Sequence, residues 1–215
     1  MKLTTKKLTT LGMLCALAII VNMMIHFPIV PAVSFLSYDP KDVVILIGGF
    51  IYGPSSAVLM SAIVSVLELM YRGGTFIDVL MNMISSLAFV LPASYLYKKN
   101  RTKKSAVQGL IIGIFVNVAV MLVWNYIVTP IYYKMPREAV VALLLPGILP
   151  FNFIKSSVNA CITLAIYKPL VSILRKGKFL STNNDERKLS KEALYIGLFI
   201  ALTLFFFYLG FKGII

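Results

Sequence analysis

The sequence predicts an all-α polytopic membrane protein, on three observations. Of its 215 residues, 59% are hydrophobic and only 13% are charged, an apolar share above that of soluble domains. The apolar residues gather in runs that approach the length of a membrane-spanning helix, about 20 residues. The basic residues, which give a net charge of +13, gather in short tracts between those runs. This distribution excludes a water-soluble domain, and it argues against a nucleic-acid partner because tracts between spans hold loops on the cytoplasmic side.

Seven apolar runs predict the helices. In chain order they cover residues 8–30, 43–53, 55–71, 76–97, 106–128, 138–167 and 193–211. The second run is too short to cross a hydrocarbon core of about 30 Å as a straight helix. We expect it to be tilted or partly shielded by protein. A turn at Gly53-Pro54 separates it from the third run, because proline disfavours helical geometry in the residue before it.

The positions of the basic residues support this division. With a turn at Gly53-Pro54, the basic tracts at 2–7, 98–104 and 168–191 all lie on one side of the membrane, which the positive-inside rule makes the cytoplasm. The expected location is the cell membrane, with a cytoplasmic N terminus. A single crossing by residues 43–71 would put the amino-terminal lysines on the wrong face. A signal peptide is the alternative for the first run, but that run is long and no clear small-residue cleavage site closes it.

A lysine within the sixth run is the outstanding functional candidate. Four polar residues share one helical face there, at spacing i, i+3, i+4 and i+7: Asn152, Lys155, Ser156 and Asn159. A charged side chain costs about 2.5–3.5 kcal/mol at the membrane centre, so it marks a site by default. Pro146 and Pro150 are expected to interrupt the helix just before this face and to expose backbone groups to a cavity. The alternative is a polar clamp between helices, with the lysine neutral or paired with a carboxylate.

A second group of polar residues lies at the outer ends of the predicted helices. Its candidate binding residues are Tyr38, Asp39, Glu68, Thr75 and Asn125. Asn125 stands between Trp124 and Tyr126, and an amide in that position can hydrogen-bond a ligand that stacks on the rings. For each tyrosine taken singly, an interfacial aromatic belt is the alternative.

The first run carries a small-residue pattern. Gly12 and Ala16 stand four residues apart, a spacing that lets another helix approach closely. The partner helix can belong to this chain or to another subunit, and the sequence favours neither.

Motifs for catalysis and metal binding are missing from the sequence. It has no Walker A lysine motif, no HExxH, no GxSxG and no zinc-ligand cluster, and its one histidine is His26. We therefore expect no enzyme activity, no metal and no cofactor. Without a phosphate-binding loop the chain cannot hydrolyse ATP, so uphill transport would need an ion gradient or another subunit. A membrane enzyme and a purely structural assembly subunit are the alternatives from other classes.

Several stretches resemble one transporter family over about residues 6–176. They are Tyr-Asp-Pro-Lys-Asp-Val at 38–43, Gly-Phe-Ile-Tyr-Gly-Pro at 49–54, Leu-Pro-Ala at 91–93 with Tyr-Lys-Lys at 97–99, Asn-Tyr at 125–126 with Pro130, and Pro-Phe-Asn-Phe-Ile-Lys at 150–155. These stretches resemble the riboflavin-specific S components of energy-coupling factor (ECF) transporters. The Gly-Pro step is common to S components in general, whereas the Asn-Tyr and Pro-Phe-Asn-Phe-Ile-Lys stretches carry the substrate assignment.

The resemblance implies a six-helix S-component bundle that captures riboflavin, its transported ligand, at the outer face. Asn152 and Lys155 would bond the isoalloxazine edge, with Asn125 nearby and Tyr38-Asp39 in the covering loop. The family also implies a membrane T subunit and two ATPase subunits, and a bundle that topples in the bilayer to release its vitamin. Gly12 and Ala16 stand where the family's AxxxA contact with the T subunit is expected, with glycine in place of the first alanine.

The expected organisation has three parts. Residues 1–176 form the substrate-binding core, 177–192 a polar cytoplasmic linker, and 193–215 an additional C-terminal transmembrane helix that the family core lacks. An S component for a different vitamin and an autonomous ion-coupled carrier are the alternatives within transport.

Overall fold

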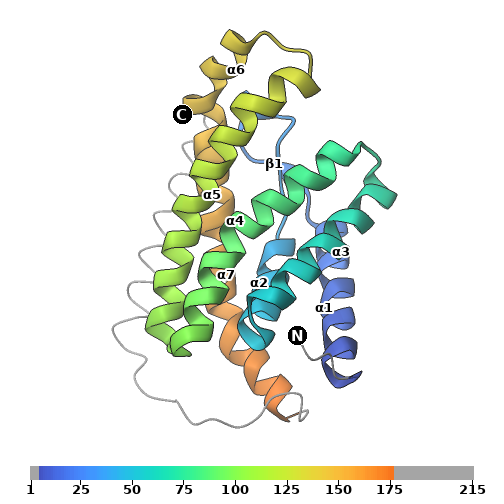
Figure 1. Cartoon of the computed structure of the whole chain (residues 1–215), viewed down its shortest axis with the longest axis vertical. Helices are drawn as coiled ribbons and strands as arrows, with labels where there is room; N and C mark the ends of the chain where they lie inside the picture. The colour runs from blue at the N-terminus through green and yellow to red at the C-terminus, as the bar shows by residue number, and fades with distance from the viewer. Residues whose placement is uncertain (1–4, 177–215) are drawn as a thin grey trace.

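A computed structural model describes residues 5–176, which form a bundle of helices (Figure 1). In chain order the elements are α1 (Thr5–Met24), β1 (Phe27–Pro28), the 3₁₀ turn η1 (Pro31–Val33), β2 (Ser37–Tyr38), α2 (Lys41–Tyr52), α3 (Pro54–Arg72), α4 (Phe76–Asn100), α5 (Lys103–Tyr132), α6 (Arg137–Leu143), the π turn η2 (Leu144–Ile148) and α7 (Leu149–Lys176). The predicted linker at 177–192 and the additional segment at 193–215 lie outside the described residues.

Five stretches of the described chain are long and apolar enough to cross a membrane. They are α1, α3, α4, α5 and the combined stretch Arg137–Tyr167. The prediction of a multi-pass membrane protein is therefore confirmed. α2 has 12 residues, which at 1.5 Å per residue make about 18 Å, well short of the hydrocarbon core.

α2 is enclosed by the rest of the bundle. Its buried residues run without interruption from Lys41 to Phe50, and it contacts α1, α3, α4 and α7. A helix with an amphipathic surface position would show a buried stripe and an exposed stripe. Of the two predicted states, tilted or shielded, the structure therefore shows a short helix shielded by protein.

The turn predicted at Gly53-Pro54 is confirmed. α2 ends at Tyr52, α3 begins at Pro54, and Gly53 between them has φ of 92°. A residue with a side chain rarely adopts this angle, so glycine suits the position. Proline suits the first helical position, where its missing N–H would have no intrahelical partner.

The first apolar run does not form one helix to residue 30, as predicted. α1 ends at Met24, and residues 25–40 form a loop, the 25–40 loop, in which β1 and β2 pair antiparallel with Phe27 opposite Tyr38. The difference arises because Pro28 and Pro31 lack the backbone N–H that a continuing helix needs. Hydropathy identified the apolar character of the run and missed this break.

The interruption predicted at Pro146 and Pro150 takes a different form. The chain stays helical there, and η2 is a π turn that leads directly into α7. A π turn shifts the hydrogen-bond register and so accommodates the missing N–H groups without ending the helix.

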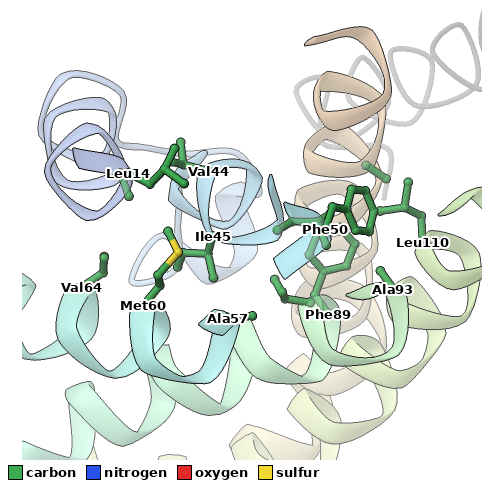
Figure 2. Close-up of a cluster of buried hydrophobic side chains, with 14 of the residues drawn as sticks. Leu14, Val44, Ile45, Phe50, Ala57, Met60, Val64, Phe89, Ala93 and Leu110 are labelled. Carbon is green, nitrogen blue, oxygen red and sulfur yellow. The ribbon is translucent and has the colours of Figure 1, made fainter. Parts of the chain in front are cut away.

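Apolar packing holds the two sides of the bundle together through α2 (Figure 2). Leu14 of α1 meets Val44, Ile45 lies against Met60 of α3, and Phe50 meets Phe89 of α4. A second apolar cluster fastens the 25–40 loop onto η2 and α7, with members Ile29, Val30, Val33, Leu36, Tyr38, Ile148, Phe151 and Ile154. The loop is thus packed onto the bundle.

α4 and α5 pack with their backbones in contact. A Cβ placed on Gly109 would lie 2.7 Å from Cα of Ala93, and one on Gly113 would collide with the carbonyl oxygen of Phe89. Only glycine permits this approach, as at other close helix crossings in membranes.

Candidate functional site

A cavity of about 210 Å³ lies where the 25–40 loop meets the bundle. It is lined by residues of that loop and of α3, α4, α5 and α7, with a short contribution from the turn after α3: His26, Phe35, Leu36, Ser37, Asp39, Ser65, Glu68, Leu69, Arg72, Gly73, Asp78, Val79, Met81, Asn82, Ser85, Met121, Phe151, Asn152 and Lys155. Its wall mixes apolar side chains with a few charged and amide groups, the composition typical of small-molecule sites. We call it the loop cavity.

The loop cavity brings together four of the predicted binding residues. Asp39, Glu68, Asn152 and Lys155 all line it, although they come from the 25–40 loop, α3 and α7. Each is largely buried, with 7% of Lys155 exposed and less of the other three. Because the four are far apart in the sequence, the fold is what makes them one site.

Lys155 forms an ion pair across the cavity wall. Its Nζ lies 2.7 Å from Oδ2 of Asp39, while the Nζ of Lys41 lies 3.8 Å from the same oxygen. Burial by itself would raise the pKa of Asp39, but the two ammonium groups outweigh it and lower that pKa to about 2. Asp39 is therefore a carboxylate, and its second oxygen, Oδ1, is buried without a hydrogen-bond partner among the described residues.

The pairing of Lys155 bears on the polar-clamp alternative. Two of the four residues on its helical face do join elements: Ser156 Oγ donates to Oδ1 of Asn117 in α5 at 2.9 Å, and Oδ1 of Asn159 accepts from the Tyr38 hydroxyl at 3.0 Å. Lys155 also joins α7 to the 25–40 loop through its ion pair with Asp39, as the clamp alternative expects, but both Lys155 and Asn152 line the cavity. The face is therefore divided between a clamp and a cavity wall.

Asn152 is oriented by the helix from which it projects. Its Nδ2 donates a hydrogen bond of 2.8 Å to the carbonyl of Ile148, one turn earlier and inside the π turn. A side chain can satisfy a carbonyl in this way where the helical ladder changes register. The π turn and the position of this amide are thus linked.

A second ion-pair network lies beside the first. Lys41 Nζ is 2.5 Å from Oε2 of Glu68, and Oε1 of Glu68 is 3.0 Å from Nε of Arg72. The Arg72 guanidinium also donates to the carbonyl and the side-chain oxygen of Asn22, at 2.7 and 2.9 Å. Asn22 lies near the end of α1, so the network runs from the cavity wall to that helix.

The remaining predicted binding residues do not line the loop cavity. Asn125 is buried within α5, where it donates to the carbonyl of Met121 and accepts from Thr129. Thr75 caps the start of α4 through Asp78. Tyr38 and Ser156 lie behind the wall, in the contacts given above.

Several residues of the cavity were missed in the sequence. The main ones are His26, Arg72 and Asn82, which line the cavity, and Lys41, which lies behind its wall. A signal existed for two of them: Arg72 stands four residues after Glu68, and Lys41 lies two residues after Asp39. From the sequence, Lys41 stands among the polar residues at the outer end of a predicted helix, and its enclosure depends on the packing of α2.

Gly12 and Ala16 lie on an exposed side of α1. A Cβ on Gly12 would meet nothing within 4 Å, and Ala16 is exposed. Neighbouring exposed residues are apolar, among them Met13, Leu17 and Ile20. Within the described part of the chain, no helix packs closely at Gly12.

Comparison with known proteins identifies the family. The sequence model of one protein family, described as ECF transporter, substrate-specific component, matches residues 6–167. Riboflavin transporter RibU of Staphylococcus aureus is 30% identical over 177 residues, covering 80% of this chain and 93% of that protein. Riboflavin transporter FmnP of Bacillus subtilis is 31% identical over 163 residues, covering 71% and 85%.

A solved structure agrees with these sequence matches. The S component of a bacterial ECF transporter superposes with a TM-score of 0.69 at 31% identity, over 79% of this chain and 97% of that one. The match covers nearly all of that structure, so the similarity extends to the arrangement of the whole bundle. This chain belongs to the family of substrate-specific (S) components of ECF transporters.

Proposed function

We propose that this chain binds riboflavin in the loop cavity and delivers it to an ECF importer. The observation that carries the proposal is the pairing of an amide and an ammonium group, Asn152 and Lys155, on one wall of a cavity with apolar neighbours. A flavin ring has apolar faces and one polar edge, and such a ligand needs this combination. Relatives named as riboflavin transporters support the choice of vitamin.

The roles of the wall residues follow from their chemistry. Asn152 offers a donor and an acceptor to the ring edge, and Lys155 offers a charged donor to a ring carbonyl or nitrogen. Asp39 and Glu68 can accept hydrogen bonds from the hydroxyl groups of the ribityl chain. Phe151, which also lines the cavity, provides apolar surface for a ring face. Tyr38 and Ser156 act from behind the wall, and Asn125 and Thr75 are not part of the proposed contact set.

The proposal includes a conformational change, because the cavity is small for a ligand of this kind. At about 210 Å³ it is smaller than the roughly 300–1,000 Å³ usual for ligand sites. We propose that the 25–40 loop moves outward when riboflavin enters and closes over it afterwards.

The proposed membrane arrangement has the 25–40 loop outside and the N terminus in the cytoplasm of a cell-membrane protein with six core helices. It follows from the basic tracts, which the positive-inside rule assigns to the cytoplasm. A T subunit and two ATPases would supply the energy, with Gly12 and Ala16 in contact with the T subunit. The exposed apolar side of α1 around these residues supports that contact.

Riboflavin titration of the purified chain in detergent tests the binding proposal, because flavin fluorescence is quenched on binding. The wild-type chain should bind saturably, and the double variant Asn152→Ala/Lys155→Ala should lose at least about 100-fold in affinity, the effect of 2.7 kcal/mol or more. Ser61→Ala is the matched control, since Ser61 is buried and lies outside the cavity wall. Unchanged binding by the double variant would remove the proposed site, and preference for another vitamin would cancel riboflavin.

Energy coupling needs a separate assay. The chain alone in proteoliposomes should bind riboflavin without concentrating it, and uptake should require the T subunit, the ATPases and ATP. Accumulation driven by an ion gradient in the absence of these subunits would favour an autonomous carrier.

A further inference from the structure

Lys41 touches the loop cavity only from behind its wall. It is 1% exposed, yet its Nζ reaches three residues that do line the cavity: Glu68 at 2.5 Å, Asn82 at 3.2 Å and Asp39 at 3.8 Å. These three belong to α3, α4 and the 25–40 loop. One buried ammonium group therefore joins three separate parts of the wall.

Lys41 and Lys155 share one carboxylate oxygen of Asp39, and this arrangement suggests a role for Lys41 in ligand binding. In the structure Oδ2 of Asp39 is paired closely with Lys155 and more distantly with Lys41. A ligand that takes a hydrogen bond from Lys155 draws that ammonium group away from Asp39. In a buried site, a carboxylate of Asp39 without a counter-ion would be strongly unfavourable unless another cation remained beside it.

We infer that Lys41 is a positioning residue that serves as the standing counter-ion of Asp39 and so allows Lys155 to turn to the ligand. Lys41 itself does not contact the ligand. Its contact with Glu68 holds it in place, because a carboxylate of α3 anchors the ammonium group at the start of α2. The inference rests on the proposed riboflavin function for the identity of the ligand.

Removal of Lys41 has a distinctive expected effect. In Lys41→Met, Asp39 would retain Lys155 alone, and Lys155 would stay locked to it. Affinity for riboflavin should fall at least about tenfold, although every wall residue is unchanged. In Lys41→Met/Asp39→Asn the ion pair that holds Lys155 is gone, and the new carboxamide still offers an acceptor oxygen to the ribityl chain, so affinity should recover at least in part. A merely structural lysine would make the double variant weaker than either single one.

The test is riboflavin titration of the full-length chain in detergent for wild type, Lys41→Met, Asp39→Asn, the double variant and the Ser61→Ala control. Lys41→Arg, which keeps the charge, should bind more tightly than Lys41→Met. Wild-type affinity in Lys41→Met, or a double variant no better than Lys41→Met, would overturn the inference.

Thermal unfolding of the same variants without riboflavin separates this inference from the function. The inference expects Asp39→Asn to be less damaging in the Lys41→Met background than alone, because the two groups are counter-ions. Absence of this coupling would overturn the inference whichever ligand binds. Failure of the wild-type chain to bind riboflavin, with the coupling present, would instead count against the proposed vitamin.

Discussion

The hydroxyl of Tyr38 donates a hydrogen bond of 3.0 Å to Oδ1 of Asn159, joining residues 121 positions apart in the chain. Tyr38 stands in β2, and Asn159 lies in α7 one turn beyond Lys155. The amide of Asn159 also donates to the backbone carbonyl of Asp39 at 3.4 Å. This contact fastens the end of the 25–40 loop to the helix that carries the proposed ligand residues.

Tyr38→Phe should therefore loosen the loop without altering the cavity wall. The loss of one buried hydrogen bond is expected to cost about 1 kcal/mol of stability. Release of riboflavin, followed by stopped-flow recovery of its fluorescence, should become several-fold faster because affinity changes usually appear in dissociation. Tyr126→Phe, at an exposed position, is the control. An unchanged release rate would mean that the apolar cluster and the contacts of Asp39 hold the loop without the Tyr38 hydroxyl.

Asp39→Asn should destabilise the ligand-free protein by about 3 kcal/mol, because Lys155 loses its buried counter-ion, while Lys41 retains Glu68. Asp39→Asn/Lys155→Met should be less damaging, since no unpaired ammonium group of Lys155 is then buried, while Lys41 keeps Glu68 in both variants. Thermal unfolding in detergent measures both. Equal losses in the single and double variants would contradict the importance of the 2.7 Å pair.

His26 should make stability depend on pH. Partial desolvation, and then the nearby Arg72, lower the pKa of His26 below its ordinary 6.5, while Asp39 and Glu68 oppose the shift. The unfolded chain therefore takes up the proton more readily, so the contribution to stability is present above pH 6.5 and is lost as the pH falls below it. Lys155 acts in the same direction as Arg72.

Thermal unfolding between pH about 7.5 and about 5.5, the range in which histidine titrates, checks this prediction. The change in unfolding temperature with pH should be smaller in His26→Gln than in the wild-type chain. If His26→Gln shows the same pH dependence of unfolding temperature as the wild-type chain, another titrating group is responsible. Asp39 does not titrate in this range, since its pKa is about 2.

Gly113→Ala should cost about 2 kcal/mol, because the added methyl group would collide with the backbone of Phe89. Gly12→Ala adds the same methyl group where nothing lies within 4 Å, and it should be neutral or stabilising by up to about 1 kcal/mol. Unfolding temperatures of the isolated chain distinguish the two. Equal effects would contradict the close packing of α4 against α5.

Periodicity and hydropathy predicted most of the helices because a bilayer imposes a length and a composition on each span. The turn at Gly53-Pro54 followed from local backbone chemistry, and the structure confirms it. The end of α1 was misplaced because Phe27 to Val30 is as apolar as the helix before it. Ile29 and Val30 of that segment are buried in the cluster with Ile148, Phe151 and Ile154, a tertiary contact that hydropathy does not register.

The candidate site was predictable where one helix presents several residues together. Asn152 and Lys155 could be identified from their spacing, since both lie on one face of one helix. Asn125 was expected beside the ligand, but whether a residue faces a cavity depends on the rotation of α5 within the bundle. The sequence identifies Lys41 as a polar residue near Asp39, but only the packing around α2 shows that its charge is enclosed.

The enclosure of α2 also constrains how the protein is made. A segment of 12 residues is too short to cross the hydrocarbon core by itself, and Lys41 and Asp42 at its start are costly in lipid. Its surroundings include α7, which is synthesised more than 100 residues later. During biogenesis, α2 therefore becomes fully enclosed only after α7 is made, and a chain truncated before α7 lacks the helix that carries Asn152 and Lys155 of the loop cavity.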